Sequence, residues 1–190
     1  MKRKIINHWT AGTLFPNNTD LEHYHFLIDA KGRLHLGLHS VSSNDCISYG
    51  DKNEFTLQTG KAGSSGLTPA SHDYAAHTGG GNTMSIGVAV CGMAGFVSPT
   101  NQGKYKLTKI QTEKLFETNA ILAFQEGYKI IDENILMTHM EFGLKHPDTS
   151  SAGKIDICWL PAYPDVKSQD VGDFIRNKSQ WYLDKLLAKK

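Results

Sequence analysis

Nine histidines are many for a chain of 190 residues, and two of them follow short apolar runs that are typical of buried strands. His8 comes after Ile5 and Ile6, and His139 comes after the run 135–138. A histidine on a strand is more often structural than a ligand, so its position must discriminate. Strand ends that face a common loop region can converge side chains on one site. We therefore expect His8 and His139 to contribute to such a site.

Asp156 supplies a carboxylate that can complete a metal site with these two histidines. Two imidazoles and one carboxylate leave the fourth position of a zinc ion open to water, as catalytic zinc sites require. Structural zinc sites normally close all four positions. The predicted ligands are therefore His8, His139 and Asp156, and the predicted cofactor is one Zn²⁺ per chain.

Lys154 lies two residues before Asp156, so the two side chains point to the same face if this segment is extended. Hydrolysis of an amide develops negative charge on the carbonyl oxygen, and a positioned cation stabilises that charge. A surface Lys–Asp pair is the commoner state of such residues. We expect Lys154 to be the catalytic cation.

The elements that must position these residues alternate between strands and helices. Strands are predicted at 4–8, 85–92 and 135–139, with a hairpin across 23–37. The hairpin turns at Asp29-Ala30-Lys31-Gly32, where the glycine allows the positive φ of a tight turn. We predict an α/β fold that occupies the whole chain, 1–190, as a single domain.

Two helices complete this fold. A capping-box pattern from Thr108 to Gln111 begins a helix whose apolar positions, Ile110, Leu115 and Leu122 among them, run on toward Gly127. A C-terminal helix is expected at about 168–188 with Asp170 as N-cap, packed on the sheet through the apolar positions Val171, Phe174, Ile175, Tyr182, Leu183 and Leu186.

Composition excludes several classes of protein. Lysine plus arginine number 20 against 19 acidic residues, so no bulk positive charge indicates a nucleic-acid partner. Hydrophobic residues make up 39%, which argues against both disorder and stable membrane insertion. The basic start of the chain meets a polar residue too early for a signal peptide.

Cys46, Cys91 and Cys158 form no CxxC pair and are expected to be reduced thiols. The Ser/Gly-rich stretch 40–76 is expected to be a partly ordered surface excursion.

Six segments resemble, in this order, the type 2 N-acetylmuramoyl-L-alanine amidases: INHWTAG, YHFLIDAKGRLHLG, AHTGGGNTMSIGVAVCG, LTKIQTEKL, ILMTH and GKID. This family includes amidase-type phage lysozymes and is related to peptidoglycan-recognition proteins. The resemblance covers about 5–156. It implies a mixed central sheet flanked by α-helices, a single catalytic zinc, and cleavage of the bond between N-acetylmuramic acid and L-alanine in peptidoglycan.

The resemblance also implies roles for individual residues. His8 and Asp156 match zinc ligands, and Lys154 matches the oxyanion-stabilising cation. Tyr24 resembles a tyrosine that phage members place over the reacting water; without the family, a half-buried strand tyrosine is an equally good interpretation. His77 and Asn82, the predicted substrate-binding pair, resemble groove residues, although a glycine-rich loop also carries polar residues for turn formation.

One departure from the family and one ambiguity bear on this site. Members without the tyrosine carry a glutamate where this chain has Ala89, which favours the tyrosine–lysine version of the site. His146 stands at a spacing from Lys154 and Asp156 that resembles several members better than His139 does. We favour His139 because it follows an apolar strand, whereas His146 lies in a polar loop before a proline. The stretch 140–151 would then be a loop that lines the groove.

Other histidines and other functions stay open at this stage. His23 with His25, and His35 with His39, form rival pairs at strand spacing, but neither has so well placed a carboxylate. The expected function is a monomeric wall-lytic amidase, synthesised in the cytoplasm and acting on the cell wall after release or injection. A cytosolic amidase that recycles muropeptides, or a module that binds peptidoglycan without cutting it, are the alternatives.

Overall fold

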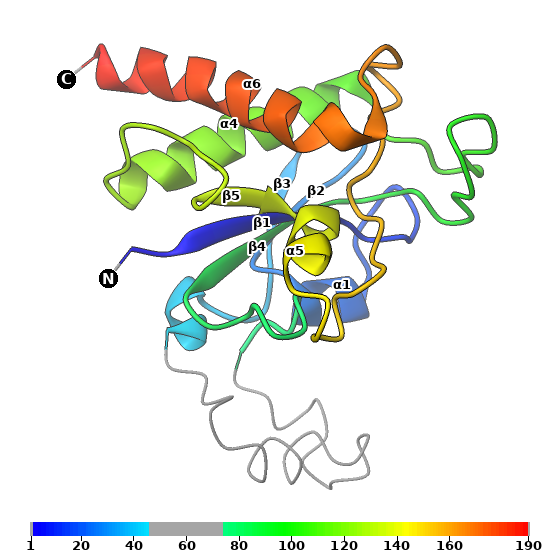
Figure 1. Cartoon of the computed structure of the whole chain (residues 1–190), viewed down its shortest axis with the longest axis horizontal. Helices are drawn as coiled ribbons and strands as arrows, with labels where there is room; N and C mark the ends of the chain where they lie inside the picture. The colour runs from blue at the N-terminus through cyan, green and yellow to red at the C-terminus, as the bar shows by residue number, and fades with distance from the viewer. Residues whose placement is uncertain (1, 46–73, 190) are drawn as a thin grey trace, which may run out of the picture.

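The computed structural model describes residues 2–45 and 74–189, so most of the predicted excursion at 40–76 lies outside the described residues (Figure 1). Five strands form one sheet in the order β3-β2-β4-β1-β5. They are β1 (Lys4–Trp9), β2 (Phe26–Ile28), β3 (Leu34–Leu36), β4 (Ser85–Val90) and β5 (Leu136–Thr138). β1 pairs in parallel with β4 and β5, β2 pairs in parallel with β4, and β2 and β3 are antiparallel. The predicted α/β fold with a mixed sheet is therefore confirmed.

The antiparallel pair is the predicted hairpin, although it is shorter than expected. Gly32 has φ +75°, as the turn required, and the buried Asp29 carboxylate accepts hydrogen bonds from the backbone N–H groups of Lys31 and Arg33 at 2.8 and 3.1 Å. The first strand begins only at Phe26, because 18–23 forms helix α1 (Asn18–His23). A capping box, Asn17 with Asp20, starts this helix and overrides the strand that we predicted from His23.

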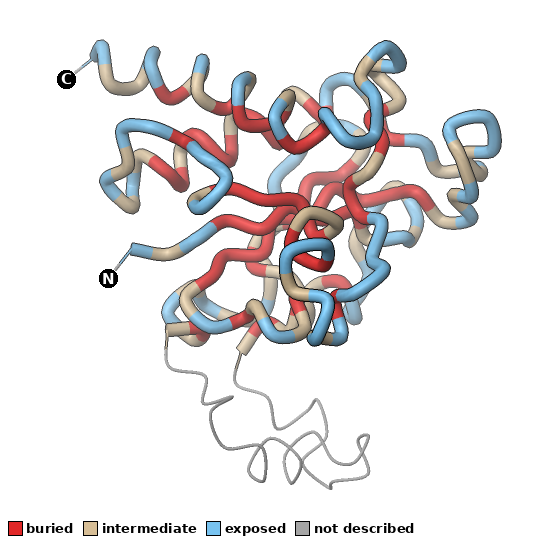
Figure 2. Tube along the Cα trace, viewed as in Figure 1, coloured by how far each residue is buried: buried red, intermediate tan, exposed pale blue. Residues whose placement is uncertain are grey.

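The main apolar core lies between the sheet and two helices, α4 (Lys109–Gln125) and α6 (Val171–Leu187). Alternation along β1 and β4 turns Ile5, Trp9, Ile86, Val88 and Val90 toward these helices. Figure 2 shows that the buried stretches run through the sheet and along the inner sides of both helices.

The predicted first residues of the two long helices agree with the structure, but one predicted apolar position does not. The predicted capping box of Thr108 and Gln111 starts α4, but Ile110 is 60% exposed, which corrects its assignment to the apolar face. Asp170 is the N-cap residue of α6, although its side chain makes no capping hydrogen bond. The C-terminal helix packs on α4 and contacts β5, which agrees with the predicted packing against the sheet.

The opposite face of the sheet carries α1 and a second short helix, α5 (His139–Lys145). Here the alternate residues of the strands form two smaller clusters: Ile6, Met137 and Phe142, and Leu27, Ala89 and Cys91. His8 belongs to this face, because it lies two residues after Ile6 on the same strand. Two 3₁₀ turns, η1 (Val41–Asn44) and η3 (Ser168–Asp170), complete the described elements.

Two further features concern the cysteines and the lengths of the helices. Cys91 and Cys158 are free thiols, as expected; Cys46 lies outside the described residues. No helix in the described ranges is long and apolar enough to cross a membrane.

Candidate metal centre

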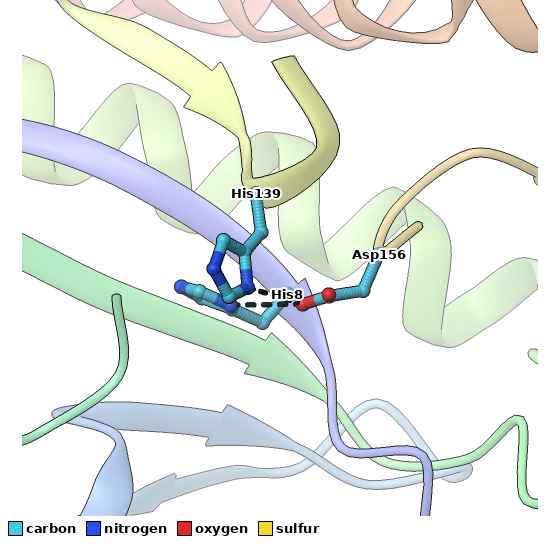
Figure 3. Close-up of side chains that lie close together, drawn as sticks. All are labelled: His8, His139 and Asp156. Atoms are coloured by element: carbon cyan, nitrogen blue, oxygen red, sulfur yellow. Dashed lines mark hydrogen bonds and ion pairs between the residues drawn. The ribbon is translucent and has the colours of Figure 1, made fainter. Parts of the chain in front are cut away.

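Three of the predicted site residues converge at the end of β1 (Figure 3). Nδ1 of His8 lies 2.9 Å from Oδ2 of Asp156, and Nδ1 of His139 lies 3.1 Å from the same oxygen. The three candidate ligand atoms are all within 4.8 Å of one another, and all three residues are buried. His8, His139 and Asp156 therefore form a group that could hold a metal ion.

His139 owes its place to a helix start rather than to the end of a strand. Thr138 is the last residue of β5 and the N-cap of α5, and it forms a capping box with Glu141. Since the helix begins at His139, the imidazole projects from its first turn toward His8. The prediction that 140–151 is a loop is therefore wrong for 140–145, which are helical because this capping box initiates α5.

The segment that carries Asp156 folds back onto α5 through close backbone contacts. The Met140 N–H donates to the Asp156 carbonyl at 2.7 Å. Gly143 allows the Ser151 carbonyl to approach the helix, because a Cβ at position 143 would collide with that oxygen. These two contacts bring a residue 17 positions after His139 back beside its imidazole.

A partly buried ion pair ties α5 to the C-terminal helix. The Arg176 guanidinium donates to both carboxylate oxygens of Glu141, at 3.0 and 2.8 Å, and to the Leu136 carbonyl at 3.0 Å. Gly172 leaves room for that carboxylate, which a Cβ would overlap. Glu141 thus caps the helix that carries His139 and is itself held by α6.

Gly143→Ala is expected to destabilise the protein and to weaken metal binding. Alanine raises intrinsic helix propensity by about 1 kcal/mol relative to glycine, so a purely local effect would be stabilising. The Cβ meets a backbone oxygen that cannot rotate away, and we expect overpacking to cost about 1–3 kcal/mol. Urea unfolding and zinc content measure the two effects, with Leu144→Ala on the exposed side of α5 as control. A Gly143→Ala protein with raised stability and unchanged zinc content would refute this account of the fold-back.

The hydrogen bonds of His139 place its proton on the nitrogen remote from Asp156. Its Nε2 lies 2.9 Å from the Ser151 hydroxyl, and that hydroxyl donates to the Gly79 carbonyl at 2.8 Å. Because the serine proton is used, Nε2–H of His139 must be the donor in the first contact. In the neutral ring, the Nδ1 lone pair then faces the Asp156 carboxylate.

The electrostatics of the other two residues suit a cation at the same point. Burial lowers the pKa of His8 to about 4, against a partial opposing effect of Asp156, so the ring is neutral at pH 7. Burial by itself would raise the pKa of Asp156, but the close approach of the His139 and His8 rings holds it well below its usual range. Two imidazole nitrogens that face a carboxylate are the donor set of a divalent metal site.

A cavity of about 490 Å³ opens beside this group of residues. Tyr24 and Lys154 line it together with His139 and Asp156. Tyr24 is the C-cap residue of α1, not a strand residue, and its ring centroid lies 5.1 Å from that of His8. Burial raises the pKa of Tyr24, so its phenol keeps its proton and can donate a hydrogen bond.

Lys154 lies at the exposed wall of this cavity. It follows a turn closed by its own N–H and the Ser151 carbonyl at 3.2 Å. Its ammonium forms no ion pair with any described carboxylate, Asp156 included. The surface Lys–Asp pair is therefore not present among the described residues, and Lys154 lines the cavity without a carboxylate partner there.

His77 and Asn82 also line the cavity, but both are buried and engaged with the protein. Asn82 Oδ1 accepts from the Thr78 N–H at 2.6 Å. Burial holds the pKa of His77 well below its ordinary value, and both of its ring nitrogens contact protein atoms. Their predicted contact with substrate stays a prediction.

Four other histidines have different partners. His146 is the C-cap of α5 and lies on the Phe142 ring, with centroids 4.4 Å apart, outside the candidate metal group. His25 accepts from the Gly87 N–H at 2.9 Å and contacts Asn44 Oδ1 at 3.1 Å. His35 contacts Asp29 in the hairpin, and His23 contacts the Thr19 carbonyl.

No protein-family model, curated protein or solved structure matches this chain. The interpretation of the site therefore depends on its own geometry and on the residues themselves.

Several residues of the site were missed in the sequence. Ser151, Thr78 and Ser85 contact the histidines of the site. The sequence contained a signal at β4, the strand that carries Ser85. Ser85, Gly87 and Ala89 alternate along β4, which leaves one face of that strand lined by small side chains. Such a face leaves space for bulky rings on it.

Proposed function

We propose that this chain is a zinc-dependent N-acetylmuramoyl-L-alanine amidase of the type 2 class. One observation supports this most directly: two imidazole nitrogens and a carboxylate oxygen converge beneath a cavity that Tyr24 and Lys154 line. The mixed sheet with helices on both faces is compatible with the fold that the resemblance implies. Since peptidoglycan is inferred from the resemblance of six segments, the substrate is part of the proposal.

Two imidazoles and one carboxylate fit a catalytic zinc ion, which would supply Lewis acidity and an activated water when bound. The chain itself supplies the groups around the reacting amide. Lys154 presents a positive charge to the cavity, where negative charge on the carbonyl oxygen would develop. Tyr24 holds a protonated phenol near His8 and can donate a hydrogen bond to that oxygen or to the attacking water.

The same arrangement favours an enzyme over a module that only binds peptidoglycan. A binding module has no need for a Lewis acid, a phenol and an ammonium around one point. His139, Asp156, Tyr24 and Lys154 line one cavity, and the buried His8 completes the metal group with His139 and Asp156. Activity on intact sacculi, compared with soluble muropeptides, separates a wall-lytic enzyme from a recycling enzyme.

Digestion of purified peptidoglycan tests the proposal. Mass spectrometry is expected to show free stem peptides that begin with L-alanine, while the glycan strands gain no new reducing ends. Removal of the metal with a chelator is expected to abolish release, and added zinc to restore it. New reducing ends would indicate a glycosidase, and full activity of metal-free protein would overturn the mechanism.

A further inference from the structure

We propose that His77 is a positioning residue for the metal centre: it accepts the Nε2–H proton of His8 and so directs the Nδ1 lone pair of His8 toward Asp156 and His139. This inference depends on the metal centre of the proposed function, but not on the reaction or the substrate. It assigns His77 a role toward the ligand His8 rather than toward a bound muropeptide.

The contacts that carry this inference form a short buried chain of polar atoms. His8 Nε2 lies 3.2 Å from His77 Nδ1 and 3.3 Å from the Thr78 hydroxyl. On the far side, His77 Nε2 lies 3.2 Å from the Ser85 hydroxyl. All four residues are buried, so protein atoms must satisfy their polar groups.

The donor and acceptor roles in this series of hydrogen bonds are set at Ser85. Its hydroxyl lies 2.6 Å from the Gly81 carbonyl and 2.8 Å from the Asn82 carbonyl. Carbonyl oxygens only accept, so the serine proton points to them, and the hydroxyl oxygen is an acceptor for His77. His77 must therefore carry its proton on Nε2.

A neutral imidazole with its proton on Nε2 has an acceptor at Nδ1. His8 Nε2 faces that acceptor, so His8 must supply the hydrogen between them. Thr78 does not change this result, since its hydroxyl, 2.8 Å from His77 Nδ1, can pass a hydrogen bond from His8 to His77. His8 then has a free lone pair on Nδ1, the atom 2.9 Å from Asp156.

The backbone of β4 holds His77 in this place. A Cβ on Gly87 would lie 2.5 Å from Cγ and 2.6 Å from Cδ2 of the His77 ring. The ring thus packs directly on the strand beside His8, at a position that only glycine leaves open. Its orientation is defined by this contact together with the bonds at both nitrogens.

His139 has a matching arrangement on the other side of the centre. Its Nε2–H donates to Ser151, whose hydroxyl donates to the Gly79 carbonyl. The two chains of hydrogen bonds therefore end on carbonyls of one loop, 79–82. This loop sets the tautomer of both ligand histidines, and outer-shell partners of this kind commonly alter metal affinity by about 10–100-fold.

Zinc affinity of substituted proteins tests the role of His77 without any substrate. His77→Phe keeps a flat ring but removes the acceptor, and we expect the zinc dissociation constant to rise about 10-fold or more in competition with a chromogenic chelator. His77→Asn retains an acceptor oxygen near the Nδ1 position and is expected to recover most of the affinity. Thermal unfolding of the metal-free variants reports separately on the fold.

A second measurement uses the unaltered protein and so does not depend on the folding of a variant. In ¹⁵N-labelled zinc-loaded protein, long-range ¹H–¹⁵N correlations of the imidazole rings are expected to show His77 with its proton on Nε2. A proton on Nδ1 of His77, or a zinc affinity of folded His77→Phe within about twofold of the wild type, would overturn the positioning role.

These outcomes are distinct from those that test the proposed function. A protein that binds zinc with the expected His77 dependence, yet releases no stem peptide, supports this inference and overturns the proposed reaction. A wild-type protein that binds no zinc overturns both.

Discussion

His139→Ala is expected to lose bound zinc and all hydrolysis, whereas His146→Ala is expected to retain about one zinc per chain. His139 Nδ1 lies 3.1 Å from Asp156 Oδ2 and belongs to the buried candidate group. His146 instead contacts the Phe142 ring at the end of α5. Loss of even an outer-shell partner costs metal affinity by about 10–100-fold, so loss of a direct ligand is expected to cost more.

Metal analysis after dialysis against a weak chelator measures this difference, and circular dichroism shows whether each variant is folded. His23→Ala is a useful control, because that imidazole contacts a backbone carbonyl of α1 and is not part of the group. If His146→Ala lost the metal while His139→Ala kept it, the ligand assignment would be wrong, and the turn at 146–151 would have to rearrange toward His8.

Lys154→Ala is expected to reduce turnover on the order of a hundredfold while zinc content stays unchanged. Removal of one group that stabilises an oxyanion commonly has an effect of this size. The Lys154 side chain lines the cavity without an ion pair to any described carboxylate, so its charge is available to a substrate. Because it is not a ligand, the metal centre does not require it.

Steady-state kinetics on a defined muropeptide separates this effect from substrate binding, since loss of charge stabilisation in the transition state lowers kcat more than it raises KM. Lys145→Ala is a matched control: it removes a lysine that pairs with Glu133 at 2.9 Å on the surface. Near-normal turnover of Lys154→Ala would assign that lysine to the protein surface.

Much of the fold was predictable because its signals are local. Short apolar runs predicted β1 and β4, and the glycine at position 32 marked the hairpin turn. The capping box at Thr108 predicted the start of α4. The same rule applied at 138–141 would have predicted α5, where we expected a loop from residue 140, and α1 begins at a related pair, Asn17 with Asp20.

The sequence by itself determined the residue types of the candidate centre and the strand that carries His8. Side-chain periodicity and caps extend over a few residues, so these features follow from neighbours in the chain. The choice of His139 over His146 was different, because it depends on contacts between distant residues.

Only the tertiary structure places His139, and not His146, beside His8 and Asp156. Gly143 admits the Ser151 carbonyl against α5, and the Met140 N–H binds the Asp156 carbonyl, which together place Asp156 beside His139. The directions of the buried hydrogen bonds were decided in the same way, since Ser85 and Ser151 orient the histidines only by donating to carbonyls of the 79–82 loop. Such long-range close approach and proton placement arise from packing, and no short sequence pattern encodes them.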